Sequence, residues 1–333
     1  MSPAADAADR DPGSFVWFIS DTQYEPQNTQ LALTRGGAWP LVVGDRDVFT
    51  LFPVLSDQGG GNGFWHLLDD SPFGPDTLRS SVSADGRIAV VSENTSDPGA
   101  IFGPTGASTS LPSDVVAVAF NAGGTLLTAD DFGNVFGFPY DEQGNIQDLA
   151  VSPFGEGALV TGDEFFFAPT QSSQSFFQLE LGVSFQGTPN LEFDALGRPH
   201  VVWTNGAAFT FDPISASWTA TQISPNLEGS FGAPLPVAAD TQGTIGTAFV
   251  EDDGDLMYAY WTASAGWNST LVDVNVDTFY QLGLDFDFDD LPVISYVKNG
   301  SVHVAYDPIV EVPEPATLGV ALAGLVLLKR RRD

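Results

Sequence analysis

Apolar residues along most of the chain recur in short alternating runs. The runs are separated by Gly, Pro, Asp and Asn, which favour turns. Before residue 316, no long segment has its apolar residues at the spacing of an amphipathic helix. The pattern therefore predicts an all-β protein made of short antiparallel strands.

The alternating runs form a repeat of about 40 to 45 residues. In the clearest unit, Asp194–Gly197 is a turn between expected strands at 190–194 and 199–204, and further strands follow at 207–212 and 217–223. The next two units align on Asp240 and Asp287. With fainter upstream units, the expected turns end at residues 37, 86, 124, 157, 197, 243 and 290.

Seven units of four strands predict a seven-bladed β-propeller over residues 14–308. A ring of six or eight blades, or two stacked sandwiches, is the alternative. The last unit lacks a fourth strand, whereas the additional apolar run 14–20 precedes the first unit. We expect this run to pair as the outer strand of the last blade, because such pairing closes the ring without a free edge.

Residues 312–333 depart from the β pattern. Pro313, Glu314 and Pro315 are followed by an uncharged apolar run at 316–328 and then by a basic cluster, whose members are Lys329, Arg330, Arg331 and Arg332. Thirteen helical residues span roughly 20 Å, against a hydrocarbon core of about 30 Å. We expect a short transmembrane helix with a cytoplasmic basic flank. A buried terminal helix or an incidental basic tail is the alternative.

The order Pro-Glu-Pro, apolar helix and basic cluster resembles the PEP-CTERM sorting signal, which residues 312–333 match from end to end. The resemblance implies processing near Pro313, Glu314 and Pro315 by an exosortase, a membrane transpeptidase-like enzyme. It also implies a Gram-negative-type bacterium. The body would lie on the periplasmic side of the inner membrane before delivery to the cell envelope or an extracellular exopolysaccharide matrix.

Such proteins normally begin with a secretory signal peptide, and residues 1–12 contain no apolar segment of that kind. We therefore expect either a start site called too late or a trimmed chain. The expected organisation is a disordered leader at 1–13, the propeller at 14–308, a linker at 309–315, and the helix with its basic tail at 316–333.

Acidic residues outnumber basic ones by 43 to 11, which gives a net charge of −32. This charge makes nucleic acids and anionic membrane surfaces poor partners for the body. The partners compatible with this charge are cations, basic proteins and polysaccharide bridged by divalent ions. The alternative explanation of the negative charge is solubility through self-repulsion. The chain has no cysteine, so its stability depends on apolar burial and sheet closure without disulfides.

Several carboxylates are candidate ligands for Ca²⁺, the one cofactor that the sequence suggests. Asp285, Asp287 and Asp289 alternate with Phe along one expected strand, and Glu192 occupies the place equivalent to Asp285. Asp194, Asp240 and Asp287 are better explained as turn residues that accept backbone hydrogen bonds. A second candidate is a hairpin tip with Asp252, Asp253 and Asp255, for which a solvated loop is the alternative.

No catalytic motif is present: the sequence has no Gly-x-Ser-x-Gly elbow, no P-loop and no cysteine nucleophile. His66, His200 and His303 fall in three different units, without a second histidine at ligand spacing. We expect a non-catalytic binding or scaffold propeller. The alternative is a hydrolase or lyase that acts on matrix polysaccharide through a pair of channel carboxylates, one of which would have a raised pKa.

Overall fold

The computed structural model contains β-strands and turns throughout the residues that it describes. Those residues are 16–19, 28–31, 39–44, 47–52, 64–70, 78–83, 85–92, 99–103, 108–130, 135–136, 146–161, 164–169, 177–180, 187–224, 227, 234–262, 266–278, 280–286 and 290–306. Within these ranges no helix has the length and apolar character needed to cross a bilayer. The expected helix at 316–328 and its basic flank lie outside the described residues.

The strands pair in seven antiparallel sheets that follow one another along the chain. The first three sheets contain, in order, β2 (Asn28–Leu31), β3 (Trp39–Gly44), β4 (Asp47–Phe52) and β5 (Phe64–Asp70); β6 (Leu78–Val82), β7 (Ile88–Ser92), β8 (Ala100–Phe102) and β9 (Ser108–Ser110); and β10 (Val115–Phe120), β11 (Leu126–Asp130) and β12 (Val135–Phe136).

The next three sheets each have four strands in chain order. They contain β13 (Asp148–Val151), β14 (Gly157–Val160), β15 (Glu164–Ala168) and β16 (Phe177–Glu180); β17 (Pro189–Phe193), β18 (Pro199–Trp203), β19 (Ala207–Asp212) and β20 (Ser217–Gln222); and β21 (Val237–Ala239), β22 (Ile245–Val250), β23 (Leu256–Thr262) and β24 (Gly266–Asp273).

The last sheet joins the two ends of the described chain. Its strands β25 (Gly283–Phe286), β26 (Pro292–Lys298) and β27 (Ser301–Tyr306) are followed in space by β1 (Val16–Ile19). β1 pairs antiparallel with β27, with Val16 opposite Tyr306 and Ile19 opposite His303. The N-terminal strand thus takes the outer position for which the sequence predicted it, and covers an edge that β27 would otherwise expose.

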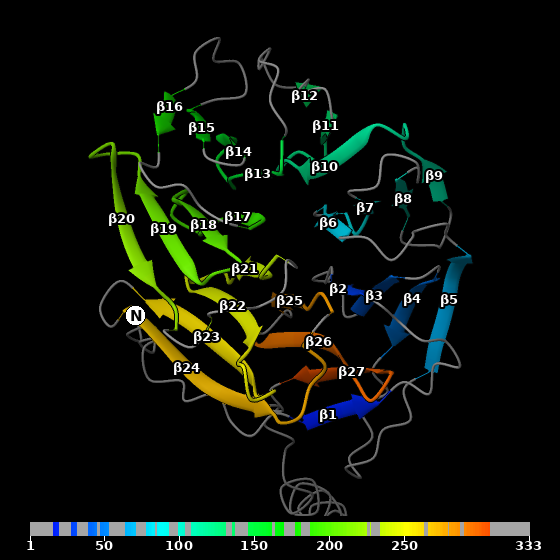
Figure 1. Ribbon diagram of the computed structural model, residues 1–333. Coiled ribbons are helices and arrows are strands. Elements are labelled where there is room, and N and C mark those ends of the chain that lie inside the picture. The colour runs from blue at the N-terminus through cyan, green and yellow to red at the C-terminus, as the bar shows by residue number, and fades with distance from the viewer. Residues whose placement is uncertain are drawn as a thin grey trace, which may run out of the picture.

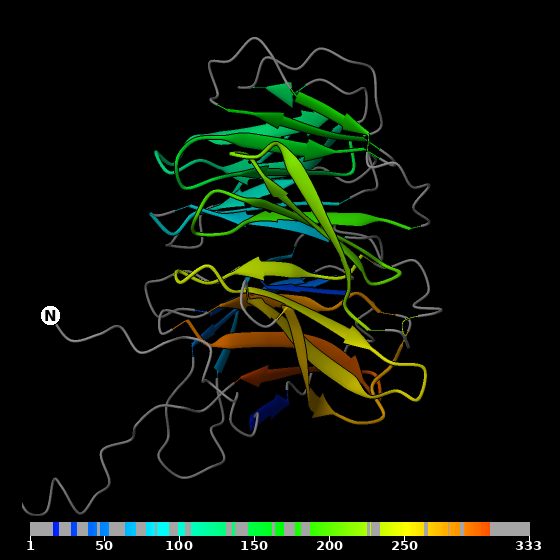
Figure 2. The same cartoon turned by 90° about the vertical axis from the view of Figure 1, so that its left-hand side faces the viewer.

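The sheets are arranged around a central axis, each with its first strand innermost (Figure 1). Each innermost strand contacts the next, in the order β2, β6, β10, β13, β17, β21 and β25, and β25 contacts β2. Figure 2 turns the molecule by 90° and brings the outer strands of the left-hand sheets toward the viewer. The predicted all-β propeller fold is confirmed.

The apolar core lies between neighbouring sheets. One cluster packs Phe165 and Phe167 of β15 against Phe211 of β19 and the fully buried Trp203 of β18. Further clusters join the second sheet to the third, the third to the fourth, the fifth to the sixth and the sixth to the seventh, and Phe249 and Tyr296 are fully buried within the last two. Trp203, Phe249 and Tyr296 are therefore packing residues, because they have no exposed surface for a ligand to contact.

A tight turn joins the first two strands of the second, third, fourth, fifth and sixth sheets. A left-handed residue ends it, with φ between 75° and 89° at Gly86, Gly124, Gly155, Gly197 and Gly243, a conformation that favours glycine. In the fourth sheet this residue is Gly155, not the expected Gly157, which instead begins β14. The error has a simple cause: the fourth repeat is degenerate, and both glycines fit the pattern.

Candidate functional site

A cavity of about 600 Å³ lies on the axis of the propeller. It is lined by the innermost strands β6, β10, β13, β17, β21 and β25 and by the turns that follow most of them. These are the strands whose labels surround the centre of Figure 1. Because β6, β10, β13, β17 and β21 end in the same kind of turn, and β25 aligns with them in the sequence repeat, residues at equal distances before that turn lie at equivalent heights in the cavity.

We name two layers of the cavity by this distance. The floor layer lies four residues before the first turn residue and includes Arg79 on β6, Asp148 on β13 and Asn190 on β17. The middle layer lies two residues before it and includes Ser81, Glu192 on β17 and Asp285 on β25. The turns themselves form the mouth.

The floor layer is a network of buried charges that connects three sheets. Arg79, only 4% exposed, places Nη1 3.2 Å from Asp148 Oδ2 and donates from Nη1 to Asn190 Oδ1 at 2.6 Å. Asp148 Oδ2 also accepts from Leu191 N at 2.7 Å. Asn190 Nδ2 donates to the Leu235 carbonyl at 2.6 Å. The guanidinium therefore spans the end of the cavity and holds the second, fourth and fifth sheets together.

A second contact strengthens the same end of the cavity. The buried Gln281, next to β25, accepts from Leu78 N and donates to the Leu78 carbonyl, both at 2.8 Å. Leu78 begins β6 and immediately precedes Arg79. The amide thus joins the last sheet to the second sheet. Arg79 and Gln281 are both almost fully buried.

The middle layer contains two carboxylates from sheets on either side of β21. Glu192 and Asp285 each accept a hydrogen bond from the next residue of their own strand, at 2.9 Å from Phe193 N and 2.8 Å from Phe286 N. The pKa of Glu192 is raised to about 8, chiefly by burial; the hydrogen bond from Phe193 N opposes the rise, and the negative charges of Asp285 and Asp148 add to it. Glu192 is therefore mostly protonated at pH 7.

Glu192 stands on the cavity wall, where protein atoms surround it and the residue keeps intermediate solvent exposure. The raised pKa of Glu192 thus reflects an acid held in a partly enclosed site beside other acids.

The mouth is built from side chains that cap their own turns. Asp194 Oδ1 accepts from Leu196 N and Arg198 N, both at 2.9 Å. Asp240 Oδ1 accepts from Gln242 N at 2.8 Å and Thr244 N at 2.7 Å. Ser83, Asn121 and Ser152 take the same place in the second, third and fourth sheets. The turn interpretation of Asp194 and Asp240 is thus confirmed.

Two neighbouring turns at the mouth each carry one exposed apolar side chain. Phe154 is 69% exposed and Leu196 is 67% exposed, and each is the third residue of its turn. The two turns touch, since a Cβ at Gly197 would lie 3.0 Å from the Phe154 ring. We call Phe154 and Leu196 the apolar lip. At the same position, the second and sixth sheets carry Asp85 and Gln242.

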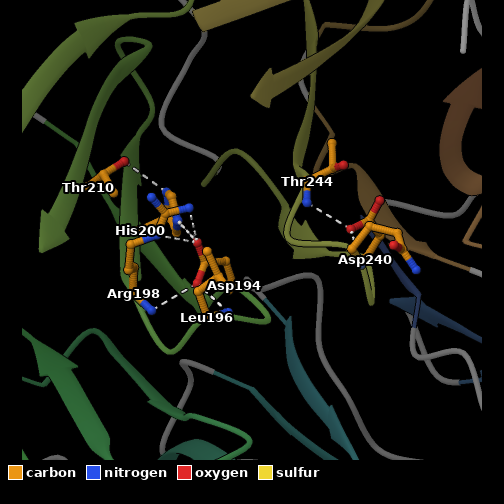
Figure 3. Close-up of polar contacts among 8 residues, drawn as sticks. Asp194, Leu196, Arg198, His200, Thr210, Asp240 and Thr244 are labelled. Carbon is orange, nitrogen blue, oxygen red and sulfur yellow. Dashed lines mark hydrogen bonds and ion pairs between the residues drawn. The ribbon is translucent and has the colours of Figure 1, made fainter. Parts of the chain in front are cut away.

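Asp194 also belongs to a buried network outside the cavity lining (Figure 3). Arg198 Nη2 lies 2.6 Å from Asp194 Oδ2, and His200 Nε2 lies 3.3 Å from the same oxygen. Burial lowers the pKa of His200 despite the nearby Asp194 carboxylate, so the ring is neutral at pH 7. The imidazole therefore donates from Nε2 to Asp194, and Nδ1 accepts from Thr210 Oγ1 at 2.9 Å.

The order hydroxyl, imidazole, carboxylate resembles the arrangement of a catalytic triad, but its surroundings differ from those of an active site. His200 is 2% exposed and Asp194 is fully buried. The His200 ring packs against Trp261 of the next sheet, with centroids 5.4 Å apart. The acid and the imidazole are thus enclosed, while the Thr210 hydroxyl is half-buried, and we interpret the network as a structural link between two sheets.

The candidate calcium ligands that the structure describes fall in two separate places. Glu192 and Asp285 line the cavity, whereas Asp252, Asp253 and Asp255 occupy the β22–β23 hairpin tip and are not part of its wall. Asp287 and Asp289 lie outside the described residues. No three His, Cys, Asp or Glu side chains in the described part of the chain are grouped as metal ligands would be.

Sequence reasoning missed the floor residues Arg79, Asp148 and Asn190. One signal was available for the first, because Arg79 is one of only 11 basic residues in an acidic chain and stands on an expected inner strand. Its partners are 69 and 111 residues away in the chain, and no local pattern connects such distant positions.

No family model matches the sequence, and no curated protein sequence matches it. Solved structures with the same fold include a catalytically inactive virginiamycin B lyase from Staphylococcus aureus with quinupristin. It has a TM-score of 0.63 and 8% identity over 88% of this chain and 99% of that chain. A streptogramin B lyase has a TM-score of 0.63 and 10% identity, with 89% and 99% coverage.

A third structure of the same fold is YCF48 bound to D1 peptide, with a TM-score of 0.58 and 16% identity over 91% of this chain and 97% of that chain. At such low identities the likeness concerns the fold alone. Propellers carry unrelated activities, so the function has to be argued from the cavity.

Proposed function

We propose that this protein is an exported propeller of the cell envelope or extracellular matrix, which binds a matrix component in its central cavity without chemical conversion. The observation that carries the proposal is the shape and chemistry of the cavity. At the level of its floor layer the buried Arg79 joins three sheets. Its middle layer is acidic, and its mouth lies among exposed turns. A cavity of this size and chemistry suits a side group or a chain end of a matrix component.

We also infer that the body is one closed ring of seven blades. The support is the seven sheets, the contact of each innermost strand with the next, and the pairing of β1 with β27. Deletion of residues 1–20 should then lower the melting temperature sharply, because β27 would lose β1, its outer neighbour in the sheet. A deletion variant that melts like the parent would contradict ring closure by β1.

The route of export rests on residues 312–333. We propose that an exosortase processes the chain at Pro313, Glu314 and Pro315, after the apolar run 316–328 and the basic cluster Lys329–Arg332 have held it in the inner membrane. The body would then face the periplasm and be released to the envelope, where exopolysaccharide or matrix proteins are its partners. The acidic composition and the absence of cysteine suit such an exported scaffold.

The sorting proposal is tested by replacement of all three motif residues with alanine. We expect the full-length variant to accumulate in the inner membrane fraction, while the parent is shortened and released. Fractionation followed by mass spectrometry of the C-terminus measures both. Release of the variant in the same processed form as the parent would contradict the proposal.

One observation supports an alternative function. Glu192 has a pKa raised to about 8, and Asp285 is a nearby second carboxylate. A protonated and an ionised carboxyl in one cavity are what a glycoside hydrolase needs as acid and base. The alternative function is therefore a hydrolase or lyase that acts on matrix polysaccharide. Release of new reducing or unsaturated ends, lost in Glu192→Gln, would favour it.

The binding proposal is tested with glycan and peptide arrays, each with and without a chelator of Ca²⁺. Ala239 lies on β21 in the cavity wall, so Ala239→Trp should obstruct the cavity and abolish binding. Ser269→Trp, on the exposed outer strand β24 of the same sheet, is the matched control and should bind like the parent. An Ala239→Trp variant that keeps all binding would contradict the proposal. Loss of binding on chelation would assign Ca²⁺ a role at the cavity.

A further inference from the structure

We propose that the cavity receives a Lys or Arg side chain from an extended basic segment of a partner protein, with an apolar neighbour of that side chain resting on the lip of Phe154 and Leu196. This inference rests on the proposed function, because it names the ligand class of the same cavity. It is carried by three features of the described residues: the depth of the middle layer, the charge there, and the one-sided apolar lip.

Depth is the first feature. The middle layer lies two residues before the turns, which corresponds to about 7 Å along a strand. An extended lysine side chain spans roughly 6 Å from Cα to Nζ. A partner backbone at the mouth can therefore place its cation between Glu192 and Asp285, while the backbone stays outside the cavity.

Charge is the second feature. The only basic side chain in the cavity wall among the described residues is Arg79, and it is bound to Asp148 and Asn190 at the floor. The middle layer contributes Glu192 and Asp285, and Asp240 lies in the wall at the mouth. A cation that enters from the mouth meets these acids before it approaches Arg79. The arrangement complements a positive group and disfavours an anionic one.

The apolar lip is the third feature, and it distinguishes a peptide from a free metal ion. Phe154 and Leu196 are exposed on two adjacent turns, beside the cavity wall residues Pro153 and Ala195. An inorganic cation gains nothing from such a surface. A Leu or Val next to the lysine would cover it and remove apolar area from water.

The proposal predicts that binding releases a proton. Glu192 carries a proton at pH 7 because its pKa is about 8, and an ammonium group beside it favours the ionised form. Calorimetric titration at pH 7 in phosphate and in Tris, whose ionisation enthalpies differ, measures this release. The probe is the acetylated and amidated pentapeptide Gly-Leu-Lys-Leu-Gly. The same peptide with norleucine in place of lysine is its control.

Substitutions test the middle-layer carboxyl groups and the apolar lip separately. Each substitution has a control at a residue outside the cavity. Glu192→Gln and Asp285→Asn should each weaken binding of the lysine peptide about tenfold, as expected for loss of a partly desolvated charge partner. Asp253→Asn, at the hairpin tip away from the cavity, should have no effect. Phe154→Ser should weaken binding about threefold to tenfold through lost apolar contact. Ile214→Ser removes a side chain that is 96% exposed elsewhere and should have no effect.

Three results would overturn the inference. They are equal binding of the norleucine peptide, unchanged affinity of both Glu192→Gln and Asp285→Asn, and no binding of the lysine peptide at millimolar concentration. If the pentapeptide fails while cellohexaose or another array glycan binds the parent and not Ala239→Trp, the cavity binds a glycan and only this inference is wrong. If no ligand is sensitive to Ala239→Trp, the proposed function fails as well.

Discussion

The floor and the middle of the cavity use charged residues in opposite ways. At the floor, Arg79 contacts Asp148 and Asn190 of two other sheets, and Gln281 joins a further pair of sheets. In the middle, Glu192 and Asp285 accept hydrogen bonds from the next residue of their own strands. The floor polar groups therefore contribute to holding the ring together, whereas the middle carboxylates add charge to a space that a ligand can enter.

The difference shows that buried charge has two roles in one cavity. A buried ion pair whose partners are satisfied fixes the relative positions of the elements that it connects. A carboxyl with a raised pKa instead lowers the stability of the ionised folded state, and such groups are concentrated at functional sites. Comparison of the two layers thus separates residues that maintain the cavity from residues that give it chemistry.

The largest effect is expected at the floor. Arg79→Met leaves Asp148, whose side chain is only 13% exposed, without its cation and should lower the free energy of unfolding by about 3 kcal/mol. The measurement is chemical denaturation at pH 7. Arg79→Met combined with Asp148→Leu should recover most of this loss, because the uncompensated charge is then absent.

Arg87→Met is the control for that experiment. Arg87 pairs with Asp85 at the surface, where the two side chains are 36% and 62% exposed, so the loss should be much smaller. A loss for Arg79→Met no larger than that for Arg87→Met would mean that the floor does not hold the sheets together.

A smaller effect is expected for Gln281→Leu. The substitution removes both hydrogen bonds to the buried backbone of Leu78 and should cost about 2 kcal/mol. Gln242→Leu, on an exposed turn, is the matched control and should be nearly neutral. Thermal unfolding followed by circular dichroism compares them. Equal melting temperatures for the two variants would contradict a structural role for the amide.

The smallest effect concerns the middle layer and depends on pH. The folded protein keeps the Glu192 proton up to about pH 8, whereas the ordinary value is 4.5. Its contribution to stability is therefore fully present below pH 4.5 and is lost as the pH rises to about 8. The free energy of unfolding should therefore fall across this range, because the carboxyl ionises less readily in the folded protein than in the unfolded chain.

Glu192→Gln should remove this part of the pH dependence and should melt at a higher temperature than the parent at pH 8.5. Asp148 and Asp285 face the same group, and Asp253→Asn at the hairpin tip serves as the carboxylate control. Denaturation of the three proteins from pH 4.5 to 8.5 measures the slopes. Parallel slopes for Glu192→Gln and the parent would show that Glu192 is ionised in the folded protein at neutral pH.

Much of the fold could be predicted from local sequence. Alternating apolar residues placed the strands of the fifth sheet within one residue of β17 to β20. The strand with which β27 pairs was also identified from its apolar run. The degenerate fourth repeat gave the wrong turn glycine, because Gly155 and Gly157 are equally compatible with a turn when the flanking residues are ambiguous.

The candidate site was only half predictable. Glu192 and Asp285 could be paired from the repeat, since both lie two residues before a turn aspartate. Neither the raised pKa of Glu192 nor the separation of the Asp252–Asp255 hairpin from the cavity could be foreseen. Both depend on which side chains share an enclosed space, and residue spacing within one sheet does not contain that information.

The strands, the capped turns and the repeat could be derived from the chain alone, because they depend on side-chain alternation and on hydrogen bonds over two to four residues. The folded arrangement was needed to show that Arg79 meets Asp148 and Asn190, that Gln281 reaches Leu78, and that Phe154 lies against the turn of Gly197. Those contacts exist because the sheets are arranged around one axis, which brings distant segments to the same height in a single cavity.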